Sequence, residues 1–67
     1  MKYIIDIWFK ESFKQLSSVF STKSERDLIY KNLCNAINNN DSSFEMLGAY
    51  VVTNTVACVL QRDKTES

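Results

Sequence analysis

The first ten residues alternate between apolar and mixed positions with a period of two, which predicts a β-strand. The apolar side carries Tyr3, Ile5, Ile7 and Phe9, and the mixed side carries Lys2, Ile4, Asp6, Trp8 and Lys10. The density of isoleucine and aromatic residues is typical of a central or well-covered strand.

Residues 13–22 predict a second strand that pairs with the first after a turn at residues 10–12. Leu16, Ser18 and Phe20 share one side of this segment. The alternation is poor, so a loop or a short helical turn is the alternative.

Residues 24–39 carry the helical pattern. Ser24 is the expected N-cap, with Asp27 three residues later. The apolar stripe at helical spacing consists of Leu28, Ile29, Leu33, Ala36 and Ile37. The Asn-rich run at residues 38–41 predicts the end of the helix, because asparagine tolerates the left-handed backbone conformation found there.

The remaining chain predicts two further strand regions. Residues 43–52 contain Gly48, the only glycine, which is expected to form a tight hairpin turn. Residues 53–55 (Thr-Asn-Thr) are expected to form a bulge or a turn. Residues 56–61 predict the last strand, and residues 62–67 predict a flexible tail.

This β-β-α-β-β order predicts an α+β fold, with one small antiparallel sheet and one amphipathic helix packed on one face. Residues 1–61 are expected to form a single domain. A single helix leaves the other face of the sheet open, and such faces usually contact another subunit or a ligand. We expect Ile4, Trp8 and some of Val51, Ala57 and Val59 to line it.

Size and charge narrow the classes of function. A chain of 67 residues buries about 60% of its unfolded surface, so domains of this size often associate with a partner. The net charge is zero, which disfavours nucleic-acid binding and attraction to anionic membranes. We find no secretory signal or apolar run of membrane-spanning length, so a cytoplasmic location is expected. The composition also resembles that of small proteins of phages and mobile elements, for which this would be the host cytoplasm.

The residues that most enzymes use are scarce. There is no histidine, and the two cysteines, Cys34 and Cys58, are 24 positions apart. Reduced cysteines buried in the core are therefore favoured over a disulfide, a zinc site or a catalytic thiol. Asp6 is the one carboxylate in a strongly apolar run, and an ion pair with Lys2, Lys10 or a subunit partner is favoured over acid–base catalysis. We expect no enzyme activity, no cofactor and no metal.

Three functions remain open. The first is a protein-interaction or inhibitor-type protein, expected to form a homo-oligomer, that uses the face around Ile4, Asp6, Trp8 and Lys10. The second is a protein that sequesters a nucleotide-type ligand in pockets between subunits. Its candidate polar contacts are Arg26, Lys31, Thr53, Asn54 and Thr55. The third is RNA or single-stranded DNA binding through the first hairpin, where Lys2, Lys10 and Lys14 are found.

Overall fold

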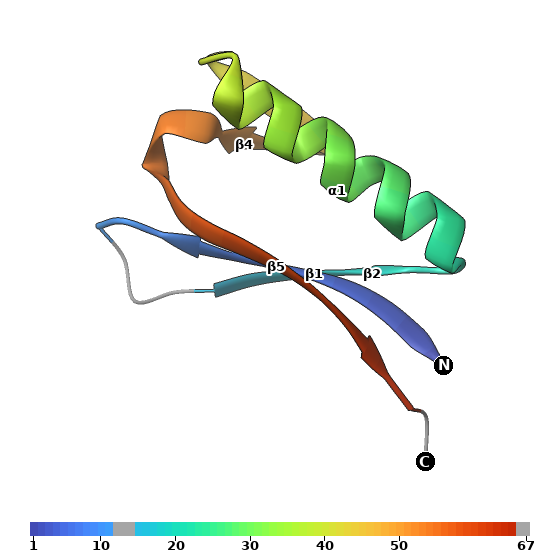
Figure 1. Ribbon diagram of the computed structural model, residues 1–67. Coiled ribbons are helices and arrows are strands. Elements are labelled where there is room, and N and C mark those ends of the chain that lie inside the picture. Colours follow the sequence, from blue (N-terminus) through green and yellow to red (C-terminus); the bar gives the residue numbers. More distant parts are fainter. Residues whose placement is uncertain (12–14, 66–67) are drawn as a thin grey trace.

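The computed structural model describes residues 1–11 and 15–65 and has the predicted α+β fold (Figure 1). The element order β-β-α-β-β is confirmed, with a short 3-10 turn before the last strand. The elements are β1 (Lys2–Phe9), β2 (Gln15–Phe20), α1 (Lys23–Asn38), β3 (Ser43–Met46), β4 (Ala49–Val52), η1 (Thr53–Thr55) and β5 (Val56–Lys64).

The strands form two antiparallel sheets, whereas one sheet was expected. β1 lies in the centre of a three-stranded sheet, between β2 and β5, and β3 pairs only with β4. The central position of β1 agrees with its apolar composition. The expected second strand is confirmed for Gln15–Phe20, and residues 13 and 14 of that prediction lie outside the described residues. Figure 1 shows α1 across one side of the three-stranded sheet, with β4 behind the helix.

The helix begins two residues earlier than expected. Thr22 is the N-cap, and its Oγ1 accepts a hydrogen bond from the backbone N–H of Glu25 at 3.2 Å. Thr22 and Glu25 have the spacing of a capping box, which is a closer match than Ser24 with Asp27. At the other end Asn40 has a φ of 59°, as expected for an asparagine that ends a helix.

The buried side of α1 differs from the predicted stripe in its first turn. Arg26 is buried there, and Leu28 is 58% exposed on another side of the helix. Leu33 and Ala36 are buried as predicted, and Ile29 and Ile37 are partly buried. Arg26 can be buried, although it is charged, because carboxylates of α1 and β5 bind its guanidinium group.

The turn between β3 and β4 is formed by Leu47 and Gly48, with φ of 51° and 80°. Gly48 therefore has the positive φ that the sequence predicted. Positive φ at both central residues is the geometry of a type I′ turn, which is common in two-residue hairpins. The Thr-Asn-Thr segment forms η1, which confirms the turn and not the bulge.

The last strand runs to Lys64, where a strand ending at Gln61 and a flexible tail were expected. Residues Arg62, Asp63 and Lys64 pair with Ile4, Tyr3 and Lys2 of β1. Their side chains are polar, so the sequence pattern does not indicate a strand. The pairing with β1 depends on backbone hydrogen bonds and not on these side chains. The core lies between the three-stranded sheet, α1 and the β3–β4 hairpin, and it contains Ile5, Ile7, Phe20, Leu33, Met46, Val51 and Val56.

Candidate functional site: the open face of the sheet

One face of the three-stranded sheet points away from α1, and among the described residues no helix or strand covers it (Figure 1). Residues that are paired across antiparallel strands share a face, so the register defines this surface. The open face consists of Lys2, Ile4, Asp6, Trp8, Gln15, Ser17, Val19, Cys58, Leu60, Arg62 and Lys64. Three of the four residues predicted to form the interface, Ile4, Asp6 and Trp8, lie together on it.

An ion pair occupies the centre of the open face. Asp6 is 2% exposed, and its Oδ2 accepts a hydrogen bond from Arg62 Nε at 2.5 Å. Its Oδ1 accepts a hydrogen bond from Ser17 Oγ at 2.6 Å, and Gln15 Nε2 donates to that serine at 3.1 Å. The partner is therefore Arg62 from the last strand, where Lys2, Lys10 or another subunit was expected.

The same contacts set the ionisation of Asp6. Burial by itself raises the pKa of the carboxyl, because it disfavours the charged form. The hydrogen bonds from Arg62 and Ser17, together with the charge of Arg62, outweigh burial and lower the pKa. Asp6 is therefore a carboxylate at neutral pH, and it holds the guanidinium group of Arg62 against the sheet.

The surface that a partner would contact is formed mainly by the strands beside β1, together with Trp8 of β1 itself. Ile4 is buried by neighbouring side chains, as Asp6 is, so neither is directly accessible. Val19 and Leu60 are 51% and 55% exposed, and Trp8 is half-buried. The accessible apolar part of the open face is thus Trp8, Val19 and Leu60, two of which the sequence did not identify.

The other residues expected on this face lie elsewhere. Val51 is in the core, and Val59 packs against the core from the side that faces α1. Lys10 is exposed in the turn after β1, and its backbone N–H donates to Thr55 O at 2.8 Å.

The five residues predicted to contact a small ligand do not form one cluster. Arg26 lies in the first turn of α1, and Lys31 is exposed further along that helix. Thr53, Asn54 and Thr55 form η1, which follows the β3–β4 hairpin. The hydroxyl of Thr53 donates to the backbone carbonyl of Asp41, and that of Thr55 donates to Val52 O at 2.6 Å.

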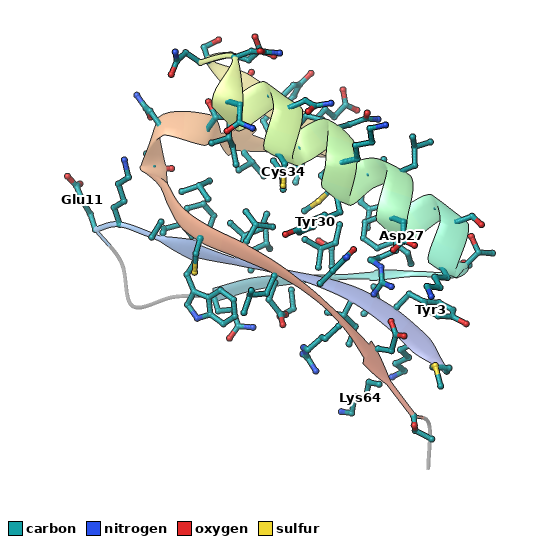
Figure 2. The ribbon with its side chains drawn as sticks, in the orientation of Figure 1. Tyr3, Glu11, Asp27, Tyr30, Cys34 and Lys64 are labelled. Atoms are coloured by element: carbon teal, nitrogen blue, oxygen red, sulfur yellow. The ribbon has the colours of Figure 1, made fainter. Side chains whose placement is uncertain are left out.

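Arg26 lines an open cleft of about 400 Å³ between the start of α1 and the end of β5. Its guanidinium group contacts Asp27 at 2.7 Å, Asp63 at 2.8 Å and Arg62 O at 2.8 Å, and it lies 5.7 Å from the ring centre of Tyr3. Figure 2 shows Tyr3 and Asp27 on the α1 side of the sheet, close to this end of the helix. Protein groups already bind this arginine, so its main role is to fasten α1 to β5.

A smaller groove of about 270 Å³ lies between the second half of α1 and β5. It is lined by Cys34, Ile37, Asn38, Val56, Ala57, Cys58 and Val59. Both cysteines are free; Cys34 is half-buried, but Cys58 is exposed, where a buried residue was expected. Burial and the neighbouring Cys34 raise the pKa of Tyr30, whose hydroxyl donates to Val59 O at 3.4 Å. Figure 2 shows Tyr30 and Cys34 next to each other between helix and sheet.

Other kinds of site are not visible in residues 1–11 and 15–65. No group of three or more Cys, Asp or Glu residues in this part of the chain could hold a metal ion. Every buried polar side-chain atom in the described segments has a hydrogen-bond partner. The single helix among the described elements is too short and too polar to cross a membrane.

Comparisons of the chain with protein-family models, with curated proteins and with solved structures found no match. The open face, the cleft and the groove are therefore the features from which a function can be inferred.

Sequence reasoning missed several accessible residues of the open face, and those that matter most for binding are Val19, Leu60, Arg62 and Lys64. All four belong to strands whose register with β1 is a property of the folded sheet. The period-two pattern of Leu60, Arg62 and Lys64 was the available signal, but the polar end of the chain resembled a tail.

Proposed function

We propose that this protein is a non-enzymatic interaction module that binds another protein through the open face. The observation that carries the proposal is the exposure of Val19 and Leu60 beside half-buried Trp8 on an uncovered sheet face. Tryptophan is enriched among the residues that dominate binding energy at protein interfaces. Occluding a partner, as inhibitor-type proteins of phages or mobile elements do in the host cytoplasm, is the role that fits so small a module.

The chemistry of Asp6 supports binding over catalysis. A general acid or base works best when its pKa lies near the working pH. Asp6 has a lowered pKa and is covered by Arg62 and Ser17. Its contacts are those of a structural carboxylate that holds Arg62 and Ser17 in place on the open face.

Self-association is the first form of the proposal to test, because a homo-oligomer can be measured without knowing a foreign partner. Leu60 and Leu28 are a matched pair, since they are 55% and 58% exposed but lie on the open face and on α1. If the open face binds a second copy, light scattering at micromolar concentration will show an oligomer in the wild type and in Leu28→Gln. Leu60→Gln and Trp8→Ala should shift the protein toward monomer.

If the wild type is a monomer, a foreign partner is tested with the same variants. Tagged wild-type and Leu28→Gln proteins should retain the same protein from lysate of the native host cell, and Leu60→Gln should lose it. Equal retention by the wild type and both variants would contradict binding through the open face.

Small-ligand sequestration is a second candidate, and the 400 Å³ cleft at Arg26 is the observation that favours it. Lys23 also lines this cleft and is exposed. Native mass spectrometry of freshly purified protein should then show a bound small molecule, which Lys23→Gln should weaken or remove. A spectrum of unliganded protein, with no thermal shift in a nucleotide panel, would contradict it.

A further inference from the structure

The open face has a basic end. Lys2 pairs directly with Lys64, and Ile4 pairs with Arg62, so these three cations lie on one face where β1 begins and β5 ends. Lys2 and Lys64 are exposed. Figure 2 shows Lys64 on the side of the sheet away from α1. Because Asp6 is the one acid on this face among the described residues, the basic end has an excess of positive charge.

Arg62 is held in place for binding. Asp6 accepts a hydrogen bond from Arg62 Nε, which carries only one of the five N–H donors of an arginine. The side chain of Arg62 remains 48% exposed. A guanidinium group that is already oriented loses less entropy when it binds a carboxylate. The buried carboxylate therefore acts as a positioning group for Arg62.

Within residues 1–11 and 15–65, no cluster of acidic side chains complements the basic end. Among residues 1–11 and 15–65, Asp27 and Asp63 bind Arg26 on the α1 side of the sheet. The other exposed acids are dispersed over a turn, the helix, the loop after it and a strand, and they are Glu11, Glu25, Asp41 and Glu45. The described part of a second copy would thus bring no acidic surface to the open face, which favours a foreign partner.

We propose that the open face binds an acidic segment of another protein. The acidic side chains of that segment contact Arg62, Lys2 and Lys64, and an apolar side chain packs on Leu60 and Trp8. This proposal rests on the proposed function and adds the chemistry of the partner. Sheets that bind single-stranded nucleic acid stack two or three bases on aromatic side chains. Within the described residues Trp8 is the single aromatic residue on this face, since Tyr3, Phe9 and Phe20 share the opposite side of the sheet.

Trp8 is the only tryptophan of the chain, so its fluorescence reports on this face alone. The probe is a short peptide in which glutamate alternates with leucine and serine. Its controls replace every glutamate with glutamine or with lysine, and a single-stranded oligonucleotide is the fourth probe. The glutamate peptide should shift the emission of Trp8 and bind more weakly as salt is raised, because salt screens exposed charges.

The matched variants are Lys2→Gln with Lys64→Gln, and Lys23→Gln with Lys31→Gln. Each double variant removes two exposed positive charges, but only the first pair lies on the open face. The first should weaken binding of the glutamate peptide about fivefold or more. The second should leave it unchanged.

Four results would overturn the proposal. If the glutamine peptide binds as tightly as the glutamate peptide, the open face binds protein without selecting acids, and the proposed function stands alone. A tighter response to the oligonucleotide would make the face a nucleic-acid site. A stable dimer in which Leu60→Gln exposes Trp8 would make a second copy the occupant. No response of Trp8 to any probe would remove the proposed partner chemistry altogether.

Discussion

Arg62 Nε lies 2.5 Å from Asp6 Oδ2, and this contact joins the last strand of the sheet to the first. The two partners are in different environments, because the side chain of Asp6 is 4% exposed and that of Arg62 is 48% exposed. Removing one partner therefore has a different consequence from removing the other.

Arg62→Met should destabilise the protein more than Asp6→Asn. The first change leaves a buried carboxylate with Ser17 as a remaining donor, and breaking a buried pair in this way costs about 3 kcal/mol. The second leaves an arginine that can turn into water, so a loss nearer about 1 kcal/mol is expected. Urea unfolding followed by circular dichroism measures the stability of both variants. A larger loss of stability for Asp6→Asn than for Arg62→Met would contradict the view that Asp6 is the buried partner that needs Arg62.

The stability of the fold should decrease in acid because of Asp6. The pKa of this carboxyl is lower in the folded protein than its ordinary value of 3.8. The ionised group therefore stabilises the fold fully above about pH 5, and this contribution is lost as the pH falls through the folded pKa. Unfolding free energies of wild type and Asp6→Asn should converge between about pH 5 and pH 2. Parallel pH profiles would show that Asp6 is not responsible.

Arg26→Met should detach the first turn of α1 from β5. The substitution keeps most of the apolar side chain but removes the contacts with Asp27, Asp63 and Arg62 O. A loss of about 2 kcal/mol is expected, since the carbonyl loses its donor and two carboxylates lose their cation. Lys31→Met on an exposed position of the same helix should change stability by less than about 0.5 kcal/mol. Equal effects of the two substitutions in thermal unfolding would argue against the fastening role.

Shortening the chain distinguishes a paired end from a flexible tail. Ending it after Lys64 keeps every strand pair of β5, so stability should change by less than about 0.5 kcal/mol. Ending it after Gln61 removes Arg62 and Asp63, the partners of Asp6 and Arg26, and should cost more than about 3 kcal/mol. Similar melting temperatures for the two forms would restore the expectation of a tail.

Leu47→Asn should stabilise the β3–β4 hairpin. Leu47 has a φ of 51°, and an L-residue with a Cβ is strained there by about 1 kcal/mol, a strain that asparagine partly relieves. Gly48→Ala tests the adjacent position. A Cβ on Gly48 would meet no atom within 4 Å, so its φ of 80° is the only cause of the expected loss of about 1 kcal/mol. Opposite shifts of the melting temperature are expected for the two variants.

Much of the fold was predictable because local patterns dominate it. The alternation in residues 2–9, the helical spacing of Leu33 and Ala36, and the single glycine in a hairpin each act over a few residues. The predictions were wrong where a residue distant in the sequence determines which side chains are buried. Arg26 is buried in place of an apolar side chain because Asp63, 37 positions beyond it, joins Asp27 in neutralising the guanidinium group.

For the open face, the sequence alone identified Ile4, Asp6 and Trp8 as one side of a strand, because side chains alternate along any extended backbone. Only the tertiary structure decided what surrounds them. The register between β1 and β5 placed Arg62 on Asp6, covered Ile4, and left Trp8 and Leu60 accessible beside a basic end. Such a register depends on backbone pairing between residues 47 to 62 positions apart, and no local pattern specifies that pairing.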